Sequence, residues 1–257
     1  MRFVLNIWRQ AGGSSEGAFE RHEVDGIDPE ASMLEMLDIL NERIIESGGS
    51  AISFDSDCRE GICGACSLLI DGIPHGPKQV TSCQVYMRDF PDGAEISIEP
   101  FRSTAFPVLR DLVVDRSPLD RIIEAGGYIS VTSGPKPEPN TNPIHPEIQE
   151  HAMDAAICIG CGACVAACPN GAAMLFTGAK VAHLNSLPQG EPERKHRVRS
   201  MIRQHDAEGF GGCTNHGECQ AACPQEISIK VIGEMNAEYR HAMLEKLRSR
   251  GGAIDPM

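Results

Sequence analysis

The stretch CREGICGAC, from Cys58 to Cys66, decides the fold of the first half of the chain. Three thiols from one short segment can converge only if the backbone curls around a common centre. Gly61 and Gly64 permit the positive φ values that such a curl requires. The curl also turns backbone N–H groups towards the sulfurs, where they stabilise negative charge. The stretch therefore predicts a loop wrapped around a metal centre.

The spacing of these cysteines indicates which centre it is. With Cys83 farther along, the pattern is C-x4-C-x2-C…C, which is typical of four thiolates that hold two bridged irons. Structural zinc is the alternative, but zinc sites usually place their C-x2-C pairs well apart. The prediction is a 2Fe-2S cluster with the ligands Cys58, Cys63, Cys66 and Cys83.

Alternating apolar residues surround this loop and predict a small mixed sheet. Phe3, Leu5 and Ile7 share one face of a strand within RFVLNIW, and a second strand is expected from Phe19 to Val24. The segments AISF, SLLIDGI and AEISIEP also have strand-like composition.

One helix should cross the sheet. Ser32 and Glu35 form a capping-box pattern ahead of apolar residues at helical spacing, and Gly48 and Gly49 should end the helix. These apolar residues are interpreted as a core face. The first half is therefore expected to be ferredoxin-like.

A phrase is repeated in the second half of the chain. CIGCGACVAACPN begins at Cys158 and CTNHGECQAACPQ begins at Cys213, and His216 stands where the first copy has Cys161. In two-cluster bacterial ferredoxins the first three cysteines of such a phrase bind one cluster and the fourth binds the other. One cluster would therefore have four thiolates and the other three. The expected sets are Cys158, Cys161, Cys164 and Cys223 for a 4Fe-4S cluster, and Cys168, Cys213 and Cys219 for the second cluster.

His216 leaves three interpretations open for the second cluster. Its imidazole could bind a fourth iron, or the corner could be vacant in a 3Fe-4S cluster, which is the preferred hypothesis. A third possibility, compatible with a vacant corner, is that His216 exchanges a proton near the cluster.

Composition excludes several classes of protein. The chain has 257 residues and a formal net charge of −13, which argues against nucleic-acid binding. Its 11 cysteines are odd in number and tightly spaced, and no export signal is apparent, so disulfides are not expected. No run of roughly 18 apolar residues is present to span a bilayer.

The second half should be mostly helical. Two short helices, broken by Pro118, are predicted for FPVLRDLVVDRSPLDRIIEAGG, and further helices for residues 151–176, 196–209 and 229–247. Residues 134–146 are proline-rich and should form a linker or an extended surface segment. The expected class is α+β, with a 2Fe-2S domain at residues 1–105 and an α-helical 4Fe-4S/3Fe-4S domain at residues 106–257.

Other polar residues receive a structural interpretation. The basic run Arg194, Lys195, Arg197, Arg199 and Arg203 should form a solvated helix face, although lipid headgroups or an anchor chain could also use it. His75, His145, His151 and His183 should be ordinary surface or loop residues. No dinucleotide fingerprint or phosphate-binding loop was found, so no catalytic residue is assigned.

The three cysteine motifs, in this order and over nearly the whole chain, resemble the iron–sulfur subunit of succinate dehydrogenase and fumarate reductase. FPVLRDLVVDRSPLDRI and CTNHGECQAACPQEI are also similar to segments of that family. The loop with HGP before Cys83 resembles members whose anchor is a single cytochrome b with two haems. The resemblance implies a β-grasp plant-type ferredoxin domain followed by an all-α bacterial-ferredoxin-like domain.

The resemblance also implies the function and the partners. Such a subunit of respiratory complex II, part of the tricarboxylic acid cycle, relays electrons between FAD in a flavoprotein subunit and quinone or haem b in a membrane anchor. The chain would then be peripheral, on the cytoplasmic side of the inner (plasma) membrane. A soluble flavoenzyme, such as a thiol-dependent fumarate reductase, is the alternative, and a structural zinc protein is a third possibility.

One feature of mitochondrial-type members is missing. Their quinone pocket uses a Trp shortly after the cysteine equivalent to Cys168 and a His directly after the one equivalent to Cys213. Here the sequence has PNGAA and Thr214 at these places, and the only tryptophan is Trp8. Quinone is therefore expected to bind through the anchor.

Overall fold

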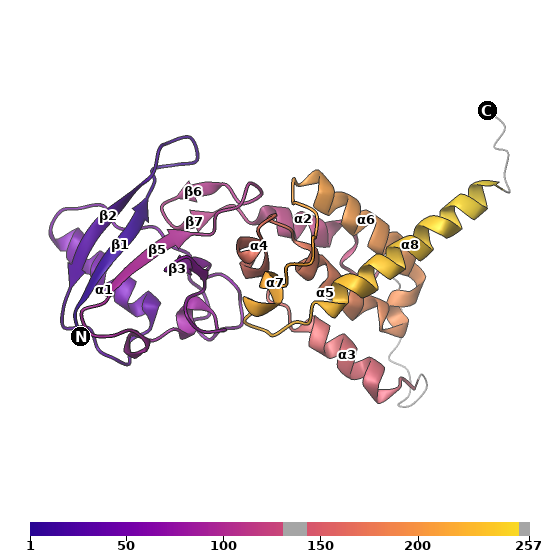
Figure 1. Cartoon of the computed structure of the whole chain (residues 1–257), viewed down its shortest axis with the longest axis horizontal. Coiled ribbons are helices and arrows are strands. Elements are labelled where there is room, and N and C mark those ends of the chain that lie inside the picture. Colours follow the sequence, from indigo (N-terminus) through magenta and orange to yellow (C-terminus); the bar gives the residue numbers. More distant parts are fainter. Residues whose placement is uncertain (131–142, 252–257) are drawn as a thin grey trace. The chain divides into compact units, whose positions relative to one another are not determined.

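The computed structural model describes residues 1–130 and 143–251, apart from the side chains of 249–251. An N-terminal sheet is followed by a helical part, which confirms the α+β class (Figure 1). The chain divides into two compact units. Unit 1 contains Met1–Arg116, Ile159–Gly171 and Thr214–Glu226, and unit 2 contains Ser117–Cys158, Ala172–Cys213 and Ile227–Met257. The predicted boundary between residues 105 and 106 stays a prediction, while unit 1 continues to Arg116.

The sheet of unit 1 has five strands in the order β2-β1-β5-β3-β4. β1 (Phe3–Arg9) pairs antiparallel with β2 (Ala18–Val24), as predicted, and parallel with β5 (Glu95–Pro100). The inward side chains of β1 are completely or almost completely buried. The short strands β3 (Leu68–Ile70) and β4 (Ile73–Pro74) follow the first cysteine loop and close the other edge.

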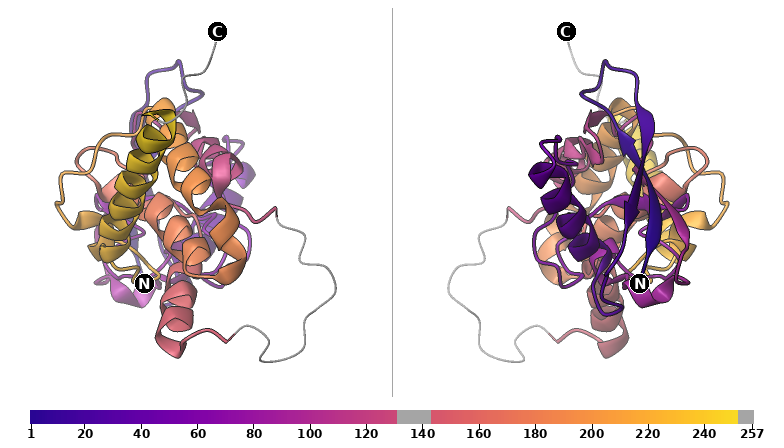
Figure 2. Two further views of the ribbon diagram at one scale, coloured as in Figure 1. Left: turned by 90° about the vertical axis from the view of Figure 1, so that its right-hand side faces the viewer. Right: turned by 90° about the vertical axis from the view of Figure 1, so that its left-hand side faces the viewer.

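Helix α1 (Met33–Glu46) packs on this sheet and provides much of its core (Figure 2). Its capping box forms as predicted: Glu35 N donates to Ser32 Oγ at 3.2 Å, and Ser32 N donates to the Glu35 carboxylate at 2.6 Å. Gly48, with φ of 82°, follows the end of the helix. The apolar face of α1 is therefore core, as its spacing indicated.

Two secondary-structure predictions for residues 1–126 are wrong. The segment AISF, residues 51–54, forms no strand. The segment after Phe106 does not begin with a helix but folds as a hairpin of β6 (Val108–Arg110) and β7 (Val113–Val114), followed by α2 (Ser117–Gly126). Three of its residues are β-branched valines, which favour strands. Pro118 lies in the first turn of α2, where a missing N–H is tolerated, so it helps to begin the helix instead of breaking it.

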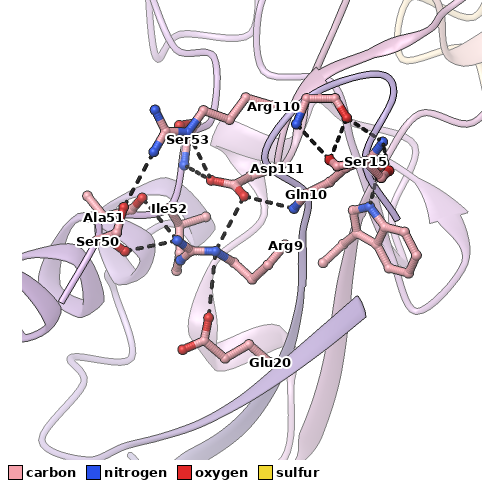
Figure 3. Close-up of polar contacts among 12 residues, drawn as sticks. Arg9, Gln10, Ser15, Glu20, Ser50, Ala51, Ile52, Ser53, Arg110 and Asp111 are labelled. Atoms are coloured by element: carbon pink, nitrogen blue, oxygen red, sulfur yellow. Dashed lines mark hydrogen bonds and ion pairs between the residues drawn. The ribbon is translucent and has the colours of Figure 1, made fainter. Parts of the chain in front are cut away.

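The carboxylate of Asp111 fixes the turn of this hairpin to the rest of unit 1 (Figure 3). The residue is only 3% exposed and has φ of 46°. Its Oδ1 accepts a hydrogen bond from Gln10 N and its Oδ2 accepts one from Ser53 N, each at 3.0 Å, and Oδ1 also lies 3.3 Å from Arg9 Nε. A buried carboxylate needs such partners. The hairpin is therefore held to the end of β1 and to the segment before the first cysteine loop.

Unit 2 is helical, which confirms the predicted runs near 196–209 and 229–247. Its remaining α-helices are α3 (Pro146–Ala156), α5 (Met174–Asn185), α6 (Arg194–Ala207) and α8 (Lys230–Gly251), and α5 contacts each of the other three. Of the proline-rich prediction, residues 134–142 lie outside the described residues, and Pro146 begins α3. Within residues 1–130 and 143–251, no helix is long and apolar enough to cross a membrane.

The basic run on α6 is not a solvated face throughout. The Arg197 side chain is fully buried, and its guanidinium donates to Gly126 O, Asn185 Oδ1 and Gly190 O at 2.6–3.1 Å. Arg194 forms a two-pronged ion pair with Glu238 on α8. The run is interpreted instead as a structural connection inside unit 2. The carbonyls that accept hydrogen bonds from Arg197 come together only in the folded state.

Candidate metal centres

The first cysteine loop, residues 58–66, curls as its glycines predicted. Gly61 and Gly64 have φ of 80° and 71°, and Arg59 also lies in the left-handed region with φ of 54°. Cys83 comes from a single 3-10 turn, Ser82–Gln84. All 11 cysteines of the chain lie in its described part, and none of them forms a disulfide. The thiols therefore remain available as metal ligands.

Hydrogen-bond donors face the sulfurs of this group. Glu60 N lies 3.3 Å from Cys58 Sγ, and Ala65 N lies 3.4 Å from Cys63 Sγ. The Thr81 hydroxyl lies 3.2 Å from Cys83 Sγ. The backbone N–H groups of Glu60 and Ile62 lower the pKa of Cys58 to about 7. Donors in these positions stabilise thiolates, which are the form that binds iron.

Burial acts in the opposite direction on Cys66. Cys66 is only 3% exposed, and removal of its thiol from water raises the pKa to about 12. A thiolate here needs positive charge close by, and the irons of a cluster would supply it. The donor set therefore fits an iron–sulfur cluster. In residues 1–130 and 143–251, no three His, Cys, Asp or Glu side chains converge on a single metal ion; ligands of a multi-iron core lie wider apart than those of one ion.

The repeated phrase has a repeated backbone. Gly160 and Asn215, which occupy equivalent positions, have φ of 64° and 62°, and the glycines Gly162 and Gly217 have φ of 85° and 88°. Each of these glycines caps a short helix, α4 (Ala163–Ala167) or α7 (Glu218–Ala221), that carries the next cysteine. The two copies therefore position their thiols with the same local geometry.

The repeat is completed after the last cysteine of each copy. Gly171 and Glu226, three residues beyond Cys168 and Cys223, have φ of 60° and 53°. Helices α4 and α7 contact each other within unit 1, and Asn170 Nδ2 donates to Thr214 Oγ1 at 2.7 Å. The two ligand segments, Ile159–Gly171 and Thr214–Glu226, therefore pack together, as the cross-ligation pattern requires. Cys158 and Cys213 directly precede these segments in the chain and are assigned to unit 2.

His216 is exposed, as are its neighbours Asn215 and Thr214. The backbone around it matches that around Cys161, so the position is suited to a ligand while the side chain differs. This leaves the three interpretations of His216 standing.

Side chains that the sequence did not single out connect residues 58–83, the region of the first four cysteines, to the two ligand segments of unit 1. The Ser67 hydroxyl donates to Cys161 O at 2.8 Å, and Gln79 Nε2 donates to Cys223 O at 2.9 Å. The Arg116 guanidinium contacts carbonyls of both residues 64 and 161. No spacing rule could have found these residues, because each acts on a backbone atom far away in sequence.

His75 is not a surface residue, contrary to the prediction. It is 1% exposed, Ser82 N donates to its Nδ1 at 3.3 Å, and the Ser82 hydroxyl lies 3.1 Å from the same atom. Burial lowers its pKa to about 4, so the imidazole is neutral at pH 7. His75 therefore supports the turn that carries Cys83 without being assigned as a ligand.

Comparison with known proteins matches two regions of the chain to iron–sulfur domains. Residues 4–121 match the model of the 2Fe-2S iron-sulfur cluster binding domain, and residues 157–227 match the 4Fe-4S dicluster domain. The succinate dehydrogenase iron-sulfur subunit of Bacillus subtilis is 29% identical over 73% of this chain and 72% of its own length. The fumarate reductase iron-sulfur subunit of Mycobacterium tuberculosis is 28% identical over 88% of this chain and 87% of its own length.

A solved structure shares the fold. A chain of the Mycobacterium smegmatis Sdh1 complex in the apo form has a TM-score of 0.60 and 21% identity, over 93% of this chain and 95% of that one. The fold and the cysteine sites thus define an iron–sulfur protein that combines a 2Fe-2S domain with a 4Fe-4S dicluster domain. More particularly, the chain is a homologue of the iron–sulfur subunits of succinate dehydrogenases and fumarate reductases.

Proposed function

We propose that this chain is the electron-transfer subunit of a succinate:quinone oxidoreductase. It would relay electrons between FAD in a flavoprotein subunit and quinone or haem b in a membrane-anchor subunit. The observation that carries the proposal is the packing of residues 58–83, which contain the first four cysteines, against both ligand segments of the repeat within one compact unit. Electron transfer between clusters weakens steeply with distance, so such packing is what an electron relay requires.

The proposed ligands follow the sequence spacing. Cys58, Cys63, Cys66 and Cys83 would hold the 2Fe-2S cluster, and Cys158, Cys161, Cys164 and Cys223 the 4Fe-4S cluster. Cys168, Cys213 and Cys219 would hold a 3Fe-4S cluster. The exposed His216 stands where the fourth thiolate ligand of this cluster would be. It supports the three-iron assignment, because a corner without a thiolate loses its iron readily.

The chain's own residues would position the clusters and adjust their potentials, while the bound clusters supply the one-electron chemistry. Donors such as Glu60 N and the Thr81 hydroxyl stabilise negative charge on the sulfurs and so favour the reduced state.

The finer fold assignment is a β-grasp plant-type domain followed by a bacterial-ferredoxin-like domain. The proposed location is the cytoplasmic side of the inner membrane, where an anchor subunit holds the chain. The curated relatives do not favour the soluble thiol-dependent enzyme.

Metal and sulfide analysis, combined with low-temperature EPR, tests this proposal. The complex is isolated anaerobically through a tag on this chain. We expect iron with acid-labile sulfide, a three-iron signal in the oxidised state, and a flavin-containing chain and a haem-containing membrane chain in the same preparation. Zinc without sulfide would contradict the cluster assignment, and iron without the haem chain would contradict the membrane assignment.

A further inference from the structure

Arg116 stands between two cysteine segments of unit 1. Its Nη1 donates to Gly64 O at 2.5 Å and to Cys161 O at 3.2 Å, with Gly160 O at 3.4 Å, and its Nη2 lies 3.5 Å from Ala65 O. One guanidinium thus contacts carbonyls of the first cysteine loop and of the first copy of the repeated phrase. Both segments bring proposed ligands, Cys63 on one side and Cys161 on the other.

The approach of these two segments requires a compensating donor. A Cβ on Gly64 would lie 2.4 Å from Ile159 O and 3.0 Å from Cys161 N, so the backbones are in direct contact. Carbonyl groups of both segments meet at this place, and their negative ends repel one another unless a donor lies between them. A planar guanidinium with several N–H groups and a permanent positive charge satisfies this need.

The charge of Arg116 has a second effect. Reduction adds an electron to a cluster, and a positive charge nearby stabilises the added negative charge. In a partly buried site this interaction is weakly screened. A cation bonded to residues adjoining the ligands of two clusters should therefore raise the reduction potential of both.

We propose that Arg116 is a positioning residue that joins the first cysteine loop to the first copy of the repeated phrase. Its charge raises the reduction potentials of both the 2Fe-2S cluster and the 4Fe-4S cluster. This inference rests on the proposed function and extends it by naming the residue whose charge acts on the reduction potentials of both clusters. It differs from cluster ligation, because Arg116 contacts backbone carbonyls and not the sulfurs.

The test uses the complete complex and EPR-monitored redox titration of both clusters. Arg116→Gln removes the charge and keeps a hydrogen-bonding side chain, whereas Arg116→Lys keeps the charge and loses the planar fork. The control is Arg110→Gln, which removes the same charge from a half-exposed residue that bonds to Ser50 and lies beside Asp111. We expect negative shifts of both midpoint potentials in Arg116→Gln that are larger than in the control, and smaller shifts in Arg116→Lys.

Two results of this titration would overturn the proposal. Potentials in Arg116→Gln that match those of the control would overturn the proposal, as would a shift confined to one cluster. If Arg116→Gln fails to retain iron, Arg116→His is titrated at about pH 6 and about pH 9, on either side of the ordinary histidine pKa. Potentials that fall with pH more steeply than in the wild type support the proposal, and parallel behaviour overturns it. A wild-type protein without the two clusters would instead refute the proposed function.

Discussion

The Ser67 hydroxyl donates a 2.8 Å hydrogen bond to the carbonyl oxygen of Cys161. Ser67 directly follows Cys66, a proposed ligand of the 2Fe-2S cluster, and Cys161 is a proposed ligand of the 4Fe-4S cluster. The two ligands are therefore connected by a path of covalent bonds that is interrupted by a single hydrogen bond. With the proposed ligands, this path would be a through-bond route for an electron within unit 1.

Ser67→Ala should weaken this connection without changing the charge of the protein. Loss of one buried hydrogen bond should lower the free energy of unfolding by about 1 kcal/mol. The magnetic interaction between the reduced clusters should also weaken, which EPR relaxation measurements detect. Ser97→Ala is the control, because Ser97 bonds to Asp71, away from the cysteine segments. Equal effects of the two substitutions would show that the Ser67 bond has no special role.

Gly64→Ala should disrupt the contact between the two segments. Alanine at φ of 71° is strained by roughly 1–2 kcal/mol, and here the new Cβ would also lie 2.4 Å from Ile159 O. Gly93→Ala is the matched control, because Gly93 has φ of 81° but no atom within 4 Å of an added Cβ. We expect lower iron content only in Gly64→Ala. Full iron content in both variants would mean that the close approach is not needed.

His216→Cys should restore the ligand that the second copy of the phrase lacks. The backbone at this position matches that at Cys161, so a thiolate can approach the cluster without rearrangement. The three-iron EPR signal of the oxidised protein should disappear, with one more iron bound per chain. His216→Ala separates the interpretations of the natural residue: an unchanged three-iron signal fits a vacant corner, whereas loss of iron would identify the histidine as a ligand.

His75 should make the protein less stable in acid. Burial lowers its pKa to about 4 from an ordinary value of 6.5, so the unfolded chain binds a proton more readily than the folded chain. The stability that the neutral imidazole provides is complete above pH 6.5 and is lost as the pH falls towards 4, by up to about 1.4 kcal/mol per pH unit.

His75→Asn should remove this part of the pH dependence. Asparagine tolerates the φ of 66° at this position and can still accept the hydrogen bond from Ser82 N. Urea unfolding of both proteins at several pH values measures the difference, and acid damage to the clusters affects both alike. Parallel curves between pH 6.5 and 4 would contradict the assignment of a neutral buried imidazole.

Asp111→Asn should destabilise unit 1 by about 3 kcal/mol, because it removes a buried charge that faces Arg9 and places an amide against backbone donors. Chemical unfolding followed by circular dichroism measures this. Asp71→Asn serves as the control: Asp71 is exposed, and an asparagine oxygen can still accept from Ser97 N. A loss for Asp111→Asn no greater than that of the control would mean that the Asp111 network is not needed for stability.

The sequence determined the elements whose causes are local. Alternating apolar residues predicted β1, Ser32 and Glu35 predicted the start of α1, and the positive φ values of Gly61 and Gly64 followed from the need to curl around converging thiols. The repeated phrase and the missing ligand at His216 were equally visible, because ligand spacing is a property of the chain itself.

Tertiary structure alone decided what depends on distant partners. Apolar spacing near Val108 favoured a helix, but Asp111 bonds to Gln10 and Ser53 and turns the segment into a hairpin. Arg197 looked like part of a solvated face until the folded chain surrounded it with carbonyls. The connection of Ser67 and Arg116 to Cys161 likewise arises only on folding, because a backbone carbonyl carries no signature in the sequence and its partner is chosen by packing.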